Sequence, residues 1–143
     1  MRRARAGGFR VIVVAAASAE EIDEAFKTLA RAHPAALLIG SDPYLYGARK
    51  QQIELAAHQS IPTMFSGRAA ASDGGLMSYG INFADGYRQA ATYVARVLKG
   101  EKPGELPVFR PTKFELVINL KTAKTLGLTI PPSVMAIADD VIE

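Results

Sequence analysis

The chain contains no cysteine, so neither a disulfide framework nor a thiolate metal site is possible, and the redox compartment stays open. Only two histidines occur, His33 and His58, and no carboxylate cluster accompanies either of them. Both follow predicted helices, where an imidazole suits the negative end of the helix dipole. No apolar run approaches the ~20 residues that a membrane-spanning helix requires. We therefore expect no metal and no cofactor.

The usual catalytic patterns are also missing. The segment Gly75-Leu-Met-Ser-Tyr-Gly80 resembles a nucleophile elbow, but Leu76 stands where that motif needs glycine. As a phosphate-binding loop the same segment fails, because Ile81 replaces the required lysine. No Gly-x-Gly-x-x-Gly occurs. We expect no enzymatic activity, with an unfamiliar site that uses Ser78 as nucleophile left as an alternative.

What is present describes an ordinary globular protein. The chain has 143 residues, of which 49% are hydrophobic and 22% charged, which suits one domain. The net charge is +3 and the pI about 9.3. Four arginines at the start account for this basicity, and the rest is near balance, so we expect a mixed surface and no nucleic-acid partner. These arginines are Arg2, Arg3, Arg5 and Arg10.

The N-terminal apolar run has two interpretations. A basic start followed by Val11–Ala17 is typical of a secretory signal, but it also suits a buried strand. The β-branched sequence Val-Ile-Val-Val favours a strand over residues 10–15, because Ser-Ala-Glu-Glu at Ser18 begins a helix at once. We therefore see no convincing signal peptide.

Apolar strands alternate with helices up to residue 80. Continuous apolar runs predict parallel strands buried on both faces, and short connections predict right-handed crossovers. The pattern indicates an α/β fold, a doubly wound lobe built on a parallel sheet. Predicted strands cover 10–15, 35–39, 62–65 and 76–78; predicted helices cover 18–33 and 48–58, and residues 66–75 form a polar loop.

The remaining residues predict one long helix and a C-terminal region. A single apolar stripe that includes Phe83, Tyr87 and Val94 predicts a strongly amphipathic helix over residues 83–99, ended by Gly100. Residues 101–107 read as a linker. We then expect a strand over 114–118, a short helix capped by Asn119, and a last helix with Val134, Ile137, Ala138 and Val141 on one face.

Polar side chains follow the predicted strands. Ligands of open α/β sheets bind beyond the carboxyl ends of the strands. These side chains predict a site for a small zwitterion, with Arg68 on a carboxylate, Asp42 on an ammonium group and a tyrosine on the apolar body. Each residue has an ordinary alternative, as a turn former, a solvated side chain or part of the core. The candidate ligand-binding residues are Ser41, Asp42, Tyr44, Ser66, Arg68, Ser78 and Tyr79.

Several strings resemble one protein family. They begin with Gly75–Gly80 and Asp85-Gly-Tyr-Arg-Gln-Ala-Ala, and continue with Val97-Leu-Lys-Gly-Glu-Lys-Pro103. The longest string is Pro111-Thr-Lys-Phe-Glu-Leu-Val-Ile-Asn-Leu-Lys-Thr-Ala-Lys-Thr-Leu-Gly-Leu128. Together they resemble ABC-transporter substrate-binding proteins of the tryptophan/tyrosine-uptake-like type. The resemblance covers about residues 8–143.

The resemblance implies a type I periplasmic binding protein, in which two α/β lobes clamp a small solute and deliver it to a membrane ABC permease. It implies a periplasmic location and no catalysis. The chain resembles only the C-terminal portion of such a protein. Residues 1–80 would then form the second lobe, 81–106 a helix and linker that pack on the missing N-terminal lobe, and 107–143 a crossing strand and helices.

A different class of function stays open beside this one. Without its first lobe, the stripe on the 83–99 helix has no native partner, and exposed apolar surface favours association. The alternative is a stand-alone α/β interaction module that dimerises through this helix, with a second copy as its self-association partner.

Overall fold

The computed structural model describes residues 8–143, which divide into two compact units, residues 8–34 and 35–143. The first unit contains α2 (Ala19–Ala32), whose predicted cap by Ser18 is confirmed, whereas Glu21 bonds one residue before the cap and not the helix start. The Ser18 Oγ accepts a hydrogen bond from the Glu21 N–H at 3.2 Å, and the Glu21 carboxylate accepts one from the Ala17 N–H at 2.7 Å. His33 ends the helix in the left-handed conformation, with φ of 45°.

The strand predicted over residues 10–15 is wrong. Residues 9–16 have no regular secondary structure, and Phe9 and Val13 are 71% and 62% exposed. A strand needs a hydrogen-bonded neighbour to satisfy its backbone, and no described strand pairs with this segment. High β-propensity alone therefore does not order these valines into a strand.

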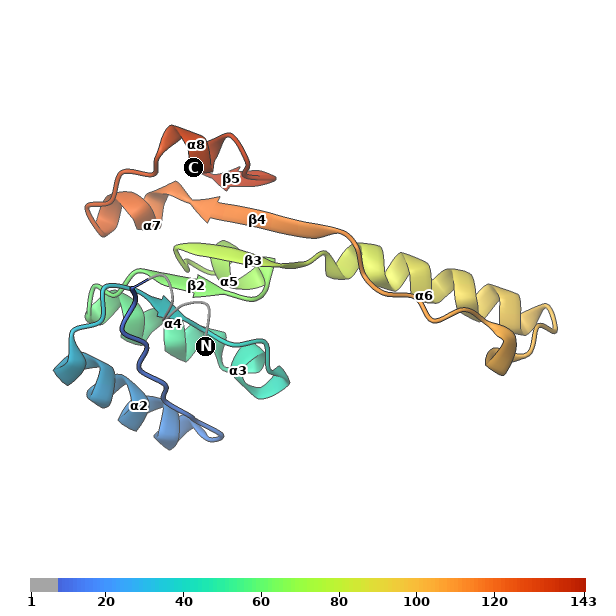
Figure 1. Cartoon of the computed structure of the whole chain (residues 1–143), viewed down its shortest axis with the longest axis horizontal. Coiled ribbons are helices and arrows are strands. Elements are labelled where there is room, and N and C mark those ends of the chain that lie inside the picture. Colours follow the sequence, from blue (N-terminus) through green and yellow to red (C-terminus); the bar gives the residue numbers. More distant parts are fainter. Residues whose placement is uncertain (1–7) are drawn as a thin grey trace. The chain divides into compact units, whose positions relative to one another are not determined.

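The second unit is built on a five-stranded sheet in the order β1-β2-β3-β4-β5, seen in Figure 1. The strands β1, β2 and β3 are parallel, β4 is antiparallel to β3, and β5 is parallel to β4. The predicted α/β fold is confirmed, with a mixed sheet in place of an all-parallel one. The strands are β1 (Leu37–Leu38), β2 (Thr63–Phe65), β3 (Met77–Ile81), β4 (Phe114–Asn119) and β5 (Asp140–Ile142).

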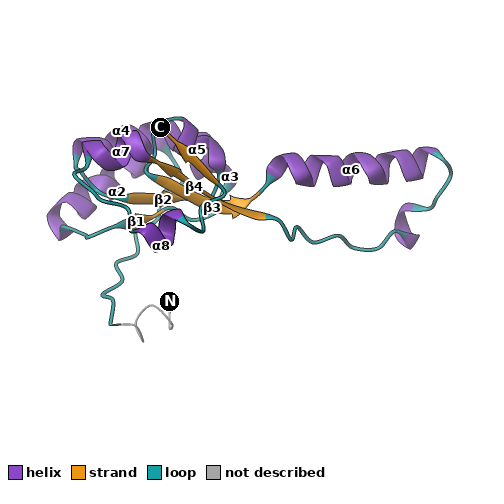
Figure 2. Ribbon diagram, turned by 90° about the horizontal axis from the view of Figure 1, so that it is seen from above, coloured by secondary structure: helices purple, strands orange, loops and turns teal. Residues whose placement is uncertain are grey.

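One face of this sheet carries most of the core. Phe65, Ser78 and Val117 lie in register across β2, β3 and β4, so their side chains share a face. The helices α4 (Arg49–His58), α5 (Arg68–Ser72) and α7 (Leu120–Thr125) lie on one side of the strands (Figure 2). Val117 and Ile118 are completely buried. The loop predicted over residues 66–75 therefore contains a helix, α5.

The long helix α6 (Phe83–Leu98) forms as predicted, but none of its residues is buried. The Asn82 side chain caps it by accepting a hydrogen bond from the Asp85 N–H at 2.9 Å, and Gly100 follows its end with φ of 99°. The chain returns beside α6 through the 3₁₀ turn η1 (Pro103–Glu105), and the Tyr93 hydroxyl donates to the Pro107 carbonyl at 2.6 Å. We call residues 83–113 the arm (Figures 1 and 2).

The C-terminal helix predicted around Val134 and Val141 is wrong. Helical structure there is limited to α8 (Pro132–Met135), and Val141 lies in β5. Asp139 explains the change, because its carboxylate accepts from the Leu116 N–H at 2.7 Å and its own N–H donates to the Leu116 carbonyl at 2.9 Å. These two bonds dock the segment beside β4. The predicted cap of α7 by Asn119 is confirmed.

Candidate functional site

All five strands contribute to one edge of the sheet. β1, β2 and β3 end there, and β4 and β5 begin there, because β4 runs against β3. The short α3 (Pro43–Gly47) follows β1 at this edge, and α5 and α6 follow β2 and β3. The loops after parallel strands are where α/β sheets place ligands. This edge is therefore the candidate site.

Close backbone packing shapes the edge. A Cβ built on Gly80 would lie 1.9 Å from the Ser66 carbonyl oxygen, so the loop after β2 crosses β3 where only glycine fits. A Cβ on the neighbouring Gly67 would lie 2.7 Å from the Tyr46 ring and 3.7 Å from Phe83. Two glycines thus let α3, α5 and the start of α6 converge.

An open pocket of about 350 Å³ lies where these elements meet. Two aromatic rings form part of its wall: Tyr46 and Phe83 have ring centroids 5.8 Å apart and are tilted by 56°. The Arg49 guanidinium lies 5.3 Å from the Tyr46 ring centroid and pairs with Asp73 at 2.8 Å. The lining residues are Tyr46, Arg68, Ala69, Asn82, Phe83, Ala84 and Glu115.

Three charged side chains lie close together at this edge: Arg68, Glu115 and Asp140. The Arg68 guanidinium donates to the Asp140 carboxylate and lies 3.9 Å from the Glu115 carboxylate. The Asn82 side-chain amide donates to the same Glu115 oxygen at 3.0 Å. The hydrogen bond from Arg68 is the main reason that the pKa of Asp140 lies below its ordinary value. Two carboxylates thus share one guanidinium.

The structure places the sequence-predicted residues differently from one another. Arg68 lines the pocket, and the Ser66 backbone contacts Gly80 beside it. Asp42 accepts from the Tyr44 and Leu45 N–H groups at 2.8 and 3.0 Å, so its carboxylate caps α3. Ser41, just before α3, and Tyr44, within α3, are both exposed.

Ser78 and Tyr79 lie within β3 and not at its end. Ser78 is completely buried, and its hydroxyl has no hydrogen-bond partner among the described residues. Tyr79 points to the opposite face of the sheet, where its ring stacks on Phe114 with centroids 5.8 Å apart. Neither residue lines the pocket.

Of the seven lining residues, only Arg68 was predicted from sequence; apart from the two alanines, the missed residues are Tyr46, Asn82, Phe83 and Glu115. Asn82 and Phe83 follow β3 as directly as the chosen residues follow their strands, so the strand-end rule would have found them if β3 had been extended to Ile81. Glu115 gave no such signal, because it depends on the antiparallel pairing of β4 with β3.

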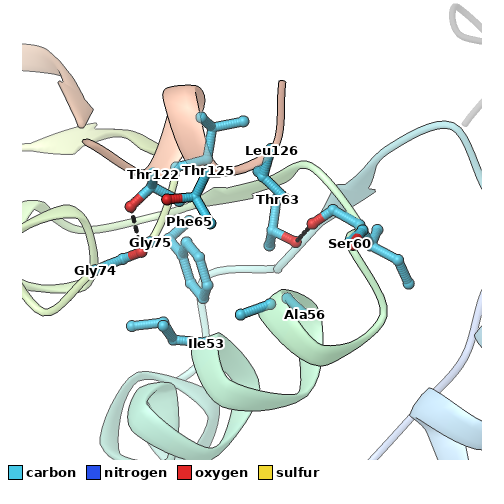
Figure 3. A pocket seen from close by; sticks show the side chains of 13 residues that line it. Ile53, Ala56, Ser60, Thr63, Phe65, Gly74, Gly75, Thr122, Thr125 and Leu126 are labelled. Carbon is cyan, nitrogen blue, oxygen red and sulfur yellow. Dashed lines mark hydrogen bonds between the residues drawn. The ribbon is translucent and has the colours of Figure 1, made fainter. Parts of the chain in front are cut away.

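A second, smaller cavity lies at the opposite end of the strands (Figure 3). It has a volume of about 70 Å³ and lies between α4, β2 and α7, with Ile53, Ala56 and Phe65 in its wall. Its threonines are already bonded: Thr122 donates to the Gly74 carbonyl at 2.8 Å, and Thr63 to the Ile61 carbonyl at 2.9 Å. With a mostly apolar wall and bonded threonine hydroxyls, it is a packing void.

Other kinds of site find no support in residues 8–143. No group of three or more histidine, aspartate or glutamate side chains there is arranged to hold a metal ion. Within the same residues, no helix has the length and apolar character needed to span a bilayer.

The family assignment rests on a match along almost the whole chain. Residues 2–142 match the model of the family described as ABC transporter substrate binding protein. The chain belongs to this substrate-binding family. A comparison with curated proteins finds no match.

Solved structures agree with this family. A Streptococcus pneumonia ABC domain in complex with L-Trp is 29% identical, with a TM-score of 0.88 over 99% of this chain and 48% of its own. A conserved domain protein from Vibrio cholerae is 27% identical, with a TM-score of 0.86 over 96% of this chain and 46% of its own.

A third structure shows the fold alone. The ligand-free, open form of a Clostridium difficile substrate-binding protein with adhesive properties is 19% identical, with a TM-score of 0.65 over 99% of this chain and 47% of its own. Our chain therefore spans about half the length of each of these three solved proteins.

Proposed function

We propose that this chain is the solute-binding component of an ABC importer and supplies one of the two lobes that enclose a small organic solute. Family membership supports a solute-binding role, because substrate-binding proteins capture ligands and do no bond-making chemistry. The single observation that carries the proposal is the pocket at the strand ends, where a ligand of an α/β sheet is expected.

The solute is proposed to be an amino acid or a compound of similar size. The Streptococcus relative, whose structure holds L-Trp, supports this, and so do the Tyr46 and Phe83 rings of the pocket. Ser41, Tyr44, Ser66 and Arg68 are the sequence-predicted residues whose position at this edge suits contact with the solute.

The other lobe and the permease complete the proposal. The arm exposes Tyr87, Val94 and Leu98 by 76%, 59% and 82%. We propose that an N-terminal lobe covers this surface, delivery is to a membrane permease, and the compartment is periplasmic or extracellular. The half-length match to the solved relatives supports a second lobe.

Calorimetry tests this function. The chain alone and a chimera that carries the N-terminal half of the Streptococcus relative are titrated with the aromatic and branched amino acids. We expect the chimera to bind one of them with micromolar affinity or better, about −8 kcal/mol, and the single lobe to bind far more weakly. A folded chimera that binds no small solute contradicts the proposal.

The exposed arm also favours a second candidate, a module that dimerises through α6. Sedimentation of the chain at increasing concentration measures this association directly. A dimer that is lost in the double variant Tyr87→Lys, Val94→Lys supports the second candidate. A monomer at high concentration eliminates it.

A further inference from the structure

The charged side chains at the pocket indicate which charged end of the solute binds there. Arg68 is the cation that sequence alone assigns to a solute carboxylate, but in the structure it is held by Asp140 and faces Glu115. Counting the three side chains gives one positive and two negative charges, a net charge of −1. An arriving carboxylate would therefore meet an excess of negative charge.

Glu115 is the charged side chain of the pocket that can still accept a hydrogen bond. Its side chain is 13% exposed, so it is largely withdrawn from water but opens into the pocket. Asn82 donates to one carboxylate oxygen, and no described residue donates to the other. A partly buried carboxylate with a free oxygen gains most from a donor that carries positive charge.

The nearby charges do not reverse this sign. Arg49 is paired with Asp73 at 2.8 Å, and Arg88 lies 3.4 Å from Asp85. Lys113 is exposed and does not line the pocket.

The aromatic wall favours the same sign independently. Ring faces carry negative electrostatic potential and attract cations. Tyr46 already attracts the Arg49 guanidinium, and Phe83 stands beside it in the pocket wall. The rings also offer apolar surface for a hydrocarbon body next to the charged group.

We propose that this pocket binds the ammonium end of an amine with an aromatic or other apolar body, with Glu115 as the anionic partner and Tyr46 and Phe83 as the wall. Arg68 is paired with Asp140, competes weakly for Glu115 at 3.9 Å, and does not bind a solute carboxylate. Asp42, bonded to two N–H groups of α3, is not the ammonium partner. This inference rests on the proposed solute-binding function and names the chemical class that this lobe selects.

The test uses two probes that share a phenylethyl body and carry opposite charges, phenethylamine and 3-phenylpropionate. Each is titrated into the full ¹⁵N-labelled chain at neutral pH while amide signals are followed. We expect phenethylamine to shift the signals of Tyr46, Asn82, Phe83 and Glu115, and to bind at least tenfold more tightly than 3-phenylpropionate.

Two variants that should change phenethylamine binding in opposite directions test the roles of Glu115 and Arg68. Glu115→Gln keeps an oxygen to accept from Asn82 but removes the charge, and should weaken phenethylamine binding at least tenfold. Arg68→Gln removes the competing cation and should strengthen it severalfold. Glu105→Gln, in the exposed η1 turn, is the matched control and should change nothing. Because Arg68→Gln is expected to gain binding, misfolding of a variant cannot imitate the whole pattern.

Each other result overturns the inference. Tighter binding of 3-phenylpropionate that Arg68→Gln abolishes makes the pocket a carboxylate site, and the proposed solute-binding function survives with its polarity reversed. Failure of both probes to shift the pocket signals rejects the amine site, while calorimetry of the two-lobed chimera still decides the proposed function separately.

Discussion

The strand β4 and the helix α6 both carry apolar side chains, but those of β4 are mostly buried and none of those of α6 is buried. Leu116, Val117 and Ile118 of β4 are at most 8% exposed, and β3 and β5 flank the strand on its two sides. α6 carries a clear apolar stripe, but no residue of it is buried. An amphipathic pattern therefore indicates that the helix packs against a partner surface. It does not show that the described chain contains that surface.

The largest effect should come from a glycine in the sheet compared with one in the arm. Gly80→Ala would bring a Cβ within 1.9 Å of the Ser66 carbonyl, so the backbone itself must move. We expect a loss of more than about 4 kcal/mol in the free energy of unfolding, measured by urea denaturation. Loss of less than about 1 kcal/mol would show that the β2 loop is not fixed against β3.

Truncation of one apolar side chain in each region sharpens the comparison. Ile118→Ala removes a completely buried side chain and should cost about 2–5 kcal/mol of unfolding free energy. Val94→Ala, at a position that is 59% exposed, should cost less than about 0.5 kcal/mol. Urea denaturation of both variants checks this. Equal costs would mean that α6 is covered in solution, by a second copy or by another surface.

The ion pair between α5 and β5 should give a smaller, pH-dependent effect. The pKa of Asp140 is lowered, chiefly by the hydrogen bond from Arg68, so its contribution is present above the ordinary value of 3.8 and is lost as pH falls through the lower folded value. The melting temperature of Asp140→Asn should lie below that of the parent chain at pH 7, and the gap should close in acid.

A matched variant separates this contribution from general acid unfolding. Glu54→Gln changes an exposed carboxylate on α4 and should leave the melting temperature close to that of the parent chain at every pH. A gap for Asp140→Asn that stays constant into acid would contradict the role of the charge.

The smallest effect should be confined to the arm. Gly86 lies in α6 with open space around its Cβ position, so Gly86→Ala should stabilise the helix by about 0.5–1 kcal/mol. Hydrogen exchange should slow at α6 amides without a matching change in global unfolding. Ala91→Gly, in the same helix, should do the reverse. A shift of global unfolding by the full amount would show that the arm and the sheet unfold together.

Local chemistry made much of the fold predictable. The capping serine at Ser18, the apolar run of β2, and the stripe and caps of α6 are patterns within a few residues, and they form as expected, whereas β3 runs three residues beyond its predicted end at Ser78. The wrong elements depend on distant pairing. Residues 10–15 lack a neighbouring strand, and Asp139 bonds to Leu116 across 23 positions of the sequence.

Of the candidate pocket, the sequence predicted the general position at the strand ends but only one lining residue, Arg68. Strand ends identified Arg68 and the loop after β1, because those residues follow their strands directly. Glu115 enters the pocket through the reversal of β4, which no periodicity reveals. Tyr46 and Tyr44 lie two residues apart in one short helix, and only packing against Phe83 distinguishes the residue that lines the pocket.

The two outermost strands have a practical consequence for handling the protein. Among the described strands, β1 is two residues long and pairs only with β2, and β5 is three residues long and pairs only with β4. An open sheet margin usually invites strand-by-strand growth into fibrils, but a margin this short offers few free backbone groups for such growth. Precipitates of concentrated samples should accordingly be amorphous aggregates that form through the exposed apolar side chains of the arm, and mild detergent should disperse them.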